Sequence, residues 1–432
     1  MNKQKKINFK FNKNKFKIGV VGVGYVGIQL VIEFAKKKFL IECFDQDFKK
    51  LKIIKSGKSP FSYINNNIFK EISKNLFINN NFKNITKCDA IIICLPTPLK
   101  NNKPDLSSIK NVWNEIKKLI RPNQLIILES TSYPGTTEEI FVNYLKSKFK
   151  LDQNIFLAYS PERENPGDKK FKFKQIPKIV AGIDQNSKRL AGMLYSQIVN
   201  KIIFVDSIKI AEMAKLLENI YRSVNIALIN ELKIFSNKIN ININKVIDAA
   251  KTKPFGFHEF RPGPGVGGHC IPIDPLYLSW IAKKNNFNTK FIELASKTNI
   301  QTTQWTIKQI NKVIKYKKIK KILMLGIAYK KNIEDTRESS GIKIFQKLRE
   351  NKISIDYCDP YVKKHEFKIK NKLSVINSKR NKANVFKKYD CFIVCSDHDI
   401  FDYKKLSKTN KYIIDLRARF IDEKNNNMII SI

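Results

Sequence analysis

The sequence predicts an α/β protein in which two Rossmann-like doubly wound domains are joined by a long central helix. Three observations favour this fold class. Continuous apolar runs such as DAIIICLP and LIILES alternate with helical segments, which is typical of a parallel sheet covered on both faces. A stretch without proline or glycine shows helical periodicity from Ile208 to about Ala250. A second group of strand-like runs opens near Ile319 and includes KKILMLGIAYKK, ISIDYCDP, DCFIVCSD and YIIDLR.

The elements follow one another in an order that predicts three domains. The first strand, Ile18 to Val21, meets glycines and then an apolar helical pattern, and the second strand, FLIECFDQD, ends in acid. The glycine- and proline-rich stretch RPGPGVGGHCIPIDP interrupts the central helical region. The last section contains a further helix from Ser339 to Glu350. We predict domains over residues 1–205, 206–310 and 311–432.

The composition excludes several classes of protein. With 432 residues, 43% of them hydrophobic, the chain is too long for one core and too apolar to be wholly disordered. No window approaches eighteen uninterrupted apolar residues, so we expect no membrane-spanning helix. The basic N-terminal residues lack the apolar stretch of a signal peptide, and the seven cysteines show no zinc-ligand or disulfide pattern. We therefore expect a cytoplasmic protein without a metal site.

The net charge of +43 would suit a nucleic-acid or membrane-surface partner. Only 10 of the 81 basic residues are arginine, however, and lysine occurs with abundant asparagine and isoleucine throughout the chain. This bias is typical of drift in an A/T-rich genome, in which lysine fills exposed positions. We interpret the charge as a solvated lysine surface, compatible with anionic substrates, rather than as a specific nucleic-acid site.

A G-x-G-x-x-G pattern lies between the first strand and its helix. Its first glycine would permit a tight turn, its second would let a pyrophosphate approach the backbone, and its third would allow close helix packing. An acid ends the next strand, where it can accept hydrogen bonds from ribose hydroxyls and repel a 2′-phosphate, which favours NAD over NADP. A tight turn in a non-binding sheet is the alternative. The expected NAD contacts are Gly22, Val23, Gly24, Tyr25, Val26, Gly27, Asp45 and Lys50.

Two further features could carry chemistry. Lys215 and Asn219 are four residues apart and share one helical face, where a cation and an amide could stabilise an oxyanion. A lysine beside apolar residues is, however, usually a surface residue. Cys270 lies in the glycine-rich stretch and is followed by Asp274. A thiolate near cations is a good nucleophile, and a buried cysteine in a structural turn is the alternative.

Seven motifs, in one order from about Lys17 to Phe420, resemble the UDP-glucose/GDP-mannose dehydrogenase family. They are GVGYVG, CLPTPL, ESTSYPGTTEE, SPERENPGD, AKLLENIYRSVNIALINEL, GPGVGGHCIPIDP and AYKKNIEDTRESS. AAKTKPFGF and RPGPGVGGHCIPIDPLYLSW look most like the bacterial branch that oxidises UDP-N-acetylhexosamines, notably UDP-N-acetylglucosamine. The resemblance implies an NAD-binding domain, then a central helical domain that forms a homodimer or higher homo-oligomer, then a C-terminal UDP-sugar-binding domain.

The resemblance also implies a two-step oxidation of the sugar C6 alcohol to a uronic acid, with two NAD reduced, for surface polysaccharide precursors. The reaction would pass through a cysteine thiohemiacetal and a thioester. Cys270 matches the family nucleophile, and Lys215 and Asn219 match the pair that stabilises the oxyanion. Asp274 matches a residue that helps to activate water.

Other positions match substrate and cofactor contacts of the family. Glu162 and Thr131 match positions near substrate and water, and Thr97 matches a cofactor-contacting turn. Thr131 is also expected to contact the cofactor. Lys330 and Arg417 match cationic contacts to the nucleotide sugar. The expected substrate contacts are Glu162, Arg163, Lys215, Asn219, Arg261, Gly265, Gly267, Lys330 and Arg417.

Three positions depart from the family patterns. Pro166 stands where glucose-specific relatives carry a second acid, and Pro254 stands where they carry an arginine from the partner subunit. Arg261 stands where the N-acetylhexosamine branch is expected to carry an aromatic residue. These differences leave open which residue activates water and which UDP-sugar is used. The alternatives are UDP-glucose, UDP-N-acetylmannosamine and UDP-N-acetylgalactosamine. A simple hydroxyacid dehydrogenase, needing no cysteine, and a basic nucleic-acid-binding protein are the alternatives of another class.

Overall fold

The computed structural model describes the chain except for residues 1–12, 14, 62, 165–170, 371 and 422–427. Pro166 and the basic N-terminal tail over 1–12 therefore lie outside the described residues. The chain divides into two compact units. The first comprises Met1–Glu218 and Trp280–Asn285, and the second comprises Asn219–Ser279 and Asn286–Ile432. The domain boundaries at 205 and 310 stay predictions.

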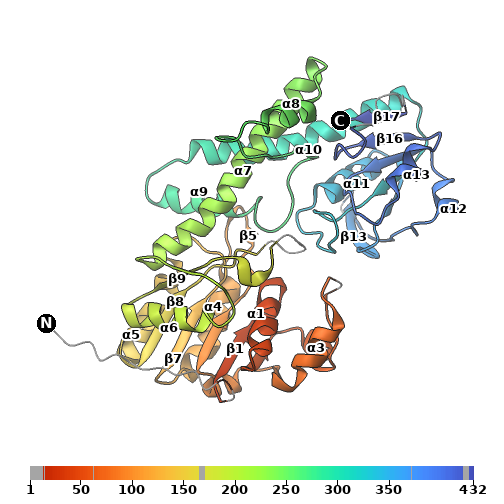
Figure 1. Ribbon diagram of the computed structural model, residues 1–432. Coiled ribbons are helices and arrows are strands. Elements are labelled where there is room, and N and C mark those ends of the chain that lie inside the picture. The colour runs from red at the N-terminus through yellow and green to blue at the C-terminus, as the bar shows by residue number, and fades with distance from the viewer. Residues whose placement is uncertain (1–12, 14, 62, 165–170, 371, 422–427) are drawn as a thin grey trace. The chain divides into compact units, whose positions relative to one another are not determined.

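The first unit is built on an eight-stranded sheet with the order β10-β9-β8-β7-β4-β1-β2-β3 (Figure 1). Neighbouring strands are parallel except β8 and β9, which are antiparallel. The run from β3 through β1 to β8 has the strand order of dinucleotide-binding folds, whose ligands bind where the order reverses, between β1 and β4. The strands are β1 (Lys17–Val21), β2 (Leu40–Phe44), β3 (Leu76–Asn79), β4 (Ala90–Ile93), β7 (Gln124–Leu128), β8 (Ile155–Tyr159), β9 (Lys178–Gly182) and β10 (Ile202–Phe204).

Short helices alternate with these strands, as the apolar runs predict. Ile18, Val20 and Ile92 of the sheet are fully buried against Leu30 and Val31 of the first helix, which explains why this sequence forms a strand–helix–strand core. The helices are α1 (Tyr25–Lys36), α2 (Phe48–Lys55), α3 (Asn66–Ile72), α4 (Ser107–Ile116), α5 (Asn143–Lys148) and α6 (Gln185–Tyr195), with a π-helical turn at Glu138–Val142 and a hairpin of β5 (Leu99–Lys100) and β6 (Lys103–Pro104).

A late segment of the chain also belongs to the first unit. Trp280 lies in Trp280–Asn285, and its ring centroid is 5.0 Å from that of Tyr133, which follows β7. The first unit is therefore discontinuous in sequence.

The long helix expected from the central pattern is α7 (Ile208–Lys238), which is shorter than the pattern predicts. The chain leaves the helix because Asn240 adopts a positive φ of 57°, which asparagine tolerates better than most residues. Asn242 then caps a new helix by accepting a hydrogen bond from the amide of Asn244. The other helices of this region are α8 (Ile243–Ala250), α9 (Asp274–Lys284) and α10 (Lys290–Tyr316).

The second unit contains a five-stranded parallel sheet with the order β12-β11-β15-β16-β17. This is another doubly wound order, which reverses between β11 and β15. Ile322 and Met324 face one apolar core while Leu323 and Leu325 face another, so both faces are covered. The elements are β11 (Lys321–Leu325), α11 (Ser340–Glu350), β12 (Ser354–Cys358), β13 (Lys364–Ile369), β14 (Lys372–Asn377), α12 (Ala383–Phe386), β15 (Cys391–Val394), α13 (Tyr403–Ser407), β16 (Tyr412–Asp415) and β17 (Ile429–Ser431), of which β13 and β14 form an antiparallel hairpin.

The prediction of an α/β protein with parallel sheets and a long helix is confirmed; the dimerisation role of the helical region stays a prediction. No helix in the described part of the chain is long and apolar enough to cross a membrane. Across the same residues, no group of three or more His, Cys, Asp and Glu side chains is placed to hold a metal ion. All seven cysteines lie at described positions, and none forms a disulfide.

Candidate active site

The glycine loop after β1 has the geometry that a bound dinucleotide requires. Gly22 has a φ of +90°, and a Cβ there would lie 2.5 Å from the carbonyl oxygen of Cys94. A Cβ at Gly27 would lie 2.0 Å from the carbonyl oxygen of Gly22, so only glycine lets α1 approach the strand. A Cβ at Gly24 would meet no atom within 4 Å, which leaves this stretch of backbone open to a pyrophosphate.

Asp45 faces this loop from the end of β2. Its Oδ2 accepts a hydrogen bond of 2.8 Å from the amide of Val23, and Oδ1 accepts one from the amide of Asp47. Lys50 lies 2.6 Å from the same Oδ2. The structure thus brings Val23, Asp45 and Lys50 together, and the donor set fits NAD. A ribose hydroxyl would share the carboxylate with Lys50.

Other expected cofactor contacts lie around the same edge of the sheet. Tyr25 packs against the rings of Phe61 and Tyr63, with centroids 4.9 Å and 5.9 Å away, an aromatic group that sequence reasoning missed. Val26 packs on the core. Thr97 and Thr131 are half-buried and follow β4 and β7, so they stand at the carboxyl edge where nucleotides bind in such sheets.

Glu212 of α7 is a buried acid that sequence reasoning also missed. Its carboxylate accepts hydrogen bonds from the amide of Gly135 at 2.5 Å and from the amide and hydroxyl of Thr137 at 2.9 Å and 2.7 Å. Burial raises the pKa of Glu212 to about 7, although these hydrogen bonds act in the other direction. The contacts tie the loop after β7, which carries Thr131, to the helix that carries Lys215. The sequence offered one signal for this residue, namely an acid within the apolar pattern of AEMAKLL.

Glu162, Arg163 and Lys215 meet within the first unit. The ammonium of Lys215 donates to the backbone carbonyl of Glu162, and Oε1 of Glu162 accepts hydrogen bonds from the amides of Arg163 and Glu164. The Arg163 guanidinium binds Glu218 at 2.7 Å. Lys215 is therefore buried against the Glu162 turn rather than solvated, which removes the surface-lysine alternative.

Asn219, Cys270 and Asp274 belong to the second unit. The amide of Asn219 donates to Oδ2 of Asp274 at 2.5 Å, and the backbone amide of Asp274 donates to the carbonyl of Cys270 at 2.9 Å. Cys270 is half-buried. The helix amide, the acid and the thiol-bearing residue are thus joined by consecutive hydrogen bonds. Burial raises the pKa of the nearby Tyr329 to about 12, with contributions from Asp335 and Cys270.

The glycines before Cys270 are required by close packing. Gly265 has a φ of +120°, and a Cβ there would lie 2.0 Å from Oγ1 of Thr303. A Cβ at Gly267 would lie 2.8 Å from Cβ of Tyr329. The amide of Gly268 donates to the carbonyl of Arg337 at 2.9 Å. The loop is fixed against α10 and the segment after β11, so these glycines serve packing whether or not they also contact a substrate.

Arg261 forms ion pairs with two acidic side chains in and near α8. Its guanidinium lies 2.5 Å from Oδ1 of Asp248 and 2.6 Å from Oε1 of Glu259. The hydrogen bonds from Arg261 and Lys251 lower the pKa of Asp248 to about 2. The arginine thus ties its own loop to α8. Its expected substrate contact would have to compete with these acids, and it stays a prediction.

Arg417 and Lys330 follow β16 and β11, at the carboxyl edge of the second sheet. The Arg417 guanidinium donates to the carbonyl of Cys395 at 2.7 Å. Sequence reasoning missed Lys233 of α7, a buried lysine that donates to the carbonyl of Gly263 at 3.2 Å. Burial and the charge of Arg417 lower the pKa of Lys233 to about 7. Two cationic side chains therefore lie close together in this part of the second unit.

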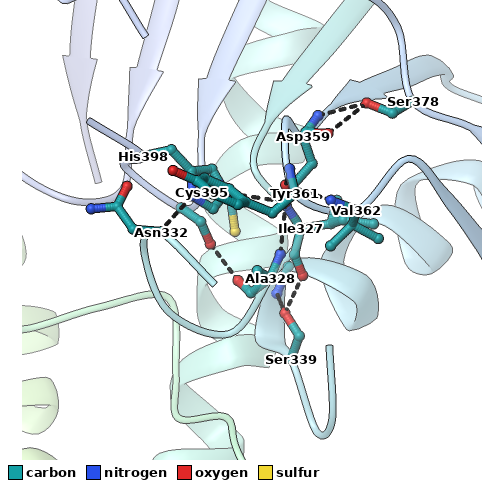
Figure 2. A network of polar contacts seen from close by, with 12 residues as sticks. Ile327, Ala328, Asn332, Ser339, Asp359, Tyr361, Val362, Ser378, Cys395 and His398 are labelled. Atoms are coloured by element: carbon teal, nitrogen blue, oxygen red, sulfur yellow. Dashed lines mark hydrogen bonds and ion pairs between the residues drawn. The ribbon is translucent and has the colours of Figure 1, made fainter. Parts of the chain in front are cut away.

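Asp359, directly after β12, binds the loop that follows β11, as Figure 2 shows for Ile327 and Ala328. Its Oδ2 accepts hydrogen bonds from the amides of Ile327 and Ala328 at 2.8 Å and 3.1 Å, and Oδ1 accepts two more from the segment after β12. His398 lies 3.1 Å away through Nε2, while its Nδ1 accepts from the amide of Asn332 at 2.8 Å. This arrangement requires the hydrogen on Nε2.

Comparisons with known proteins find matches along nearly the whole chain. Three models of the UDP-glucose/GDP-mannose dehydrogenase family match: the NAD binding domain over residues 16–199, the central domain over 209–301 and the UDP binding domain over 323–423. The chain is 32% identical to a UDP-N-acetyl-D-glucosamine 6-dehydrogenase of Pseudomonas aeruginosa, over 95% of this chain and 98% of that protein.

Two relatives carry another substrate in their names. A UDP-N-acetyl-D-mannosamine dehydrogenase of Methanocaldococcus jannaschii is 31% identical, over 93% of this chain and 92% of that protein. The solved structure of a UDP-D-ManNAc dehydrogenase from Pyrococcus horikoshii superposes with a TM-score of 0.83 at 27% identity, covering 96% of this chain and 99% of that one.

Proposed function

The chain belongs to the UDP-glucose/GDP-mannose dehydrogenase family and is an NAD-dependent oxidoreductase of nucleotide sugars, and on this premise we propose that it oxidises a UDP-N-acetylhexosamine. The proposed reaction converts the C6 alcohol to a uronic acid in two steps, as a precursor for surface polysaccharide. UDP-N-acetylglucosamine is the first candidate, because KTKPFGF and the residues around Cys270 resemble that branch. UDP-N-acetylmannosamine is the second, because relatives with both names match this chain almost equally well.

In the proposed mechanism Cys270 is the nucleophile. NAD, when bound, supplies the hydride acceptor for both oxidations. The first oxidation removes a hydride and a proton from the alcohol and gives an aldehyde. Sγ of Cys270 then adds to C6, and the resulting thiohemiacetal loses a second hydride and its hydroxyl proton to become a thioester. Water breaks the C–S bond, which releases the acid and returns the thiol, so two NADH form for each sugar.

The hydrogen bonds around Cys270 are the observation that carries this proposal. Asn219 and Asp274 contact each other and Asp274 contacts the Cys270 backbone, so an amide donor and an acid accompany the thiol. The amide suits the oxyanion of the adduct, and Asp274 suits activation of the water. The family resemblance assigns Lys215 the role of a second donor to the oxyanion. Its ammonium donates to the backbone carbonyl of Glu162.

The test is turnover of purified UDP-sugars by the enzyme and by Cys270→Ser, with Cys395→Ala as the matched control. Cys395 is a buried thiol whose pKa burial raises to about 11, so its loss should leave turnover intact. We expect two NADH per sugar from the enzyme and from the control, and a loss of at least about a thousandfold in uronic acid from Cys270→Ser, because an alkoxide is far harder to form than a thiolate. Uronic acid formed at the normal rate by Cys270→Ser would contradict the thioester mechanism.

A panel of UDP-sugars separates the substrate alternatives. UDP-N-acetylglucosamine, UDP-N-acetylmannosamine, UDP-N-acetylgalactosamine and UDP-glucose would each be compared by kcat/KM, with mass analysis of the product. We expect the N-acetyl sugars to exceed UDP-glucose. NADH production from none of them would contradict the proposed function as a whole.

We also propose a homodimer, formed along α7. Five apolar side chains on this helix are exposed and recur at spacings of three, four or seven residues, as one face of a helix does: Leu217, Tyr221, Leu228, Leu232 and Phe235. A second copy covering this face is the proposed occupant. Light scattering should give twice the mass of 50.2 kDa, and Leu228→Asp should yield the monomer. We place the enzyme in the cytoplasm, where a reactive thiol stays reduced.

A further inference from the structure

Beneath the turn that carries Glu162 lies a buried charge cluster, which comprises Glu129, Glu162, Lys178 and Tyr195. The ammonium of Lys178 lies 3.0 Å from Oε1 of Glu129 and 3.7 Å from Oε2 of Glu162. The exposed fractions of the three charged side chains are 5% for Lys178, 0% for Glu129 and 13% for Glu162. The hydroxyl of Tyr195 donates to Glu129, and its ring centroid lies 4.9 Å from the ammonium.

The antiparallel pairing of β8 and β9 explains why this lysine reaches the site. Ala158 pairs with Gly182 and Tyr159 pairs with Ala181. Continuing that register beyond the end of β8 places Glu162 opposite Lys178, the first residue of β9. A parallel strand would instead bring its last residue to this edge. The reversal of β9 therefore delivers a cation to the carboxyl edge of the sheet, where Glu129 and Glu162 also stand.

The charges of the cluster do not balance without Lys178. Within the described residues, Oε2 of Glu129, Oε2 of Glu162 and the ammonium of Lys178 take part in no hydrogen bond, so the two ion pairs of Lys178 supply the compensation. Burial alone would lower the pKa of Lys178, but the two carboxylates outweigh burial and raise it, so the lysine stays charged. Burial raises the pKa of Glu129. Cys94, Glu164 and Lys215 also lie near the cluster, with Glu33 beside Glu164. Burial, Glu162 and Glu33 raise the pKa of Glu164 to about 8.

We propose that Lys178 is a positioning residue whose ammonium compensates the Glu162 carboxylate and holds the Glu162 turn in place. This inference rests on the proposed function, in which Glu162 lies near substrate and water. The side chain of Glu162 is held by Lys178 and by two backbone amides, and its carbonyl receives Lys215. Loss of Lys178 would leave two buried carboxylates facing each other, which favours protonation of one of them and releases the turn.

The test compares Lys178→Met, which removes the charge, with Lys178→Arg, which keeps it. We expect Lys178→Met to lose about tenfold or more in kcat near pH 7 and to shift the acid limb of the kcat profile upward by about one pH unit, since the ionised form of Glu162 becomes harder to reach. Lys178→Arg should restore the position of the acid limb. Lys17→Met is the matched control, because Lys17 forms an ion pair of 3.5 Å with buried Glu42 elsewhere on the same sheet.

Two additions keep the proposal falsifiable. Should Lys178→Met unfold, the charge-balanced Lys178→Met/Glu129→Gln would recover the melting temperature while Glu162 still lacks its cation. The pH midpoint of Glu162, followed by ¹³C NMR of labelled glutamate and assigned with Glu162→Gln, should lie higher in both variants than in the enzyme, and this reading does not need turnover. A wild-type midpoint and pH profile in the double variant would overturn the positioning role. An inactive wild-type enzyme would contradict the proposed function instead.

Discussion

The eight-stranded and the five-stranded sheet each place a carboxylate at the same topological position and use it differently. Asp45 follows β2 beside the loop after β1, and Asp359 follows β12 beside the loop after β11. Asp45 accepts one amide from its neighbouring loop, one from its own segment and the ammonium of Lys50, and it remains half-buried. Asp359 accepts two amides from its neighbouring loop, two from its own segment and the Nε2 hydrogen of His398, and it is fully buried (Figure 2). The Asp45 carboxylate can still accept a hydrogen bond from a ribose hydroxyl. The Asp359 carboxylate has all its hydrogen bonds within the protein.

The loops next to these acids differ in the same sense. Gly22 and Gly326 each follow the first strand of their sheet with a positive φ, +90° and +77°. Two residues later the first sheet has Gly24, where a Cβ would meet nothing, and the second has Ala328, whose amide binds Asp359. The strand–loop–acid arrangement of the first sheet therefore suits cofactor binding. The same arrangement in the second sheet uses Asp359 to fix the loop that carries Lys330.

The largest expected effect is on the second sheet. Asp359→Ala should destabilise the protein by about 3–5 kcal/mol, because it leaves His398 and four amides without their buried acceptor. Urea unfolding would measure the loss. If Asp359 instead served a ligand as Asp45 is expected to, the variant would lose binding affinity but keep its stability.

The stability supplied by Asp359 should depend on pH. Burial alone would raise its pKa, but the hydrogen bonds from His398 and the backbone lower it. A carboxyl whose folded pKa lies below its unfolded value, about 3.9, stabilises the fold above that pH and loses this contribution as the pH falls through the folded pKa. In Asp359→Asn the acid-side loss of stability should be smaller. Equal acid slopes in the two proteins would count against this role.

The next effect concerns the open glycine. Gly24→Ala should fold normally, since the added Cβ meets no atom, but it should raise KM for NAD by about tenfold or more, equivalent to about 1.4 kcal/mol. Ala328→Gly is the control in the second sheet and should leave KM for NAD unchanged. Unaltered NAD kinetics in Gly24→Ala would show that the pyrophosphate does not approach this backbone.

Asp45→Ala should have a somewhat smaller effect. We expect KM for NAD to rise several-fold, to about tenfold, with less change in kcat, because the ribose contact is remote from the hydride. Lys50 loses its partner at 2.6 Å in this variant, so use of NADP should improve. Steady-state kinetics with both cofactors measure this. Equal turnover of NADP by the unmodified enzyme would mean that Asp45 does not select against the 2′-phosphate.

The smallest effects are expected at buried thiols of the two sheets. Cys94→Ala and Cys358→Ala should each cost about 1 kcal/mol or somewhat more and keep turnover. Burial raises the pKa of Cys358 to about 12. At neutral pH this cysteine is therefore a protonated thiol and a poor nucleophile. Thiol labelling followed by mass spectrometry should modify Cys270 first. Loss of activity in Cys94→Ala would move the nucleophile to the first sheet.

Sequence reasoning succeeded where the determining residues are close together in the chain. The glycine loop and Asp45 belong to one strand–turn–helix–strand unit. The contact between the loop and this carboxylate could therefore be predicted from their spacing in the sequence. Asn219 and Asp274 are far apart in sequence, and only the family resemblance indicated their common role. The alternation of apolar runs predicted parallel sheets, but it could not give the order of strands in the second sheet.

What escaped prediction depends on contacts between remote segments. The partners of Glu212 lie in a loop more than seventy residues earlier. Lys178 faces Glu129 and Glu162 only because β9 runs antiparallel to β8, and no local sequence pattern distinguishes a reversed strand from a strand in the common direction. Arg261 meets Asp248 because its loop folds back on α8, which composition could not reveal.

The contact between Tyr133 and Trp280 has a consequence for synthesis of the chain on the ribosome. The first unit needs a tryptophan that emerges roughly sixty residues after Glu218. Synthesis proceeds at about 5–20 residues per second, so Tyr133 of the nascent first unit lacks its Trp280 partner for several seconds. Folding during translation is therefore expected to pause at an almost complete first unit, which chaperones can bind until Trp280 arrives. Fragments that end at Glu218 should expose the Tyr133 ring and aggregate more readily than the full chain.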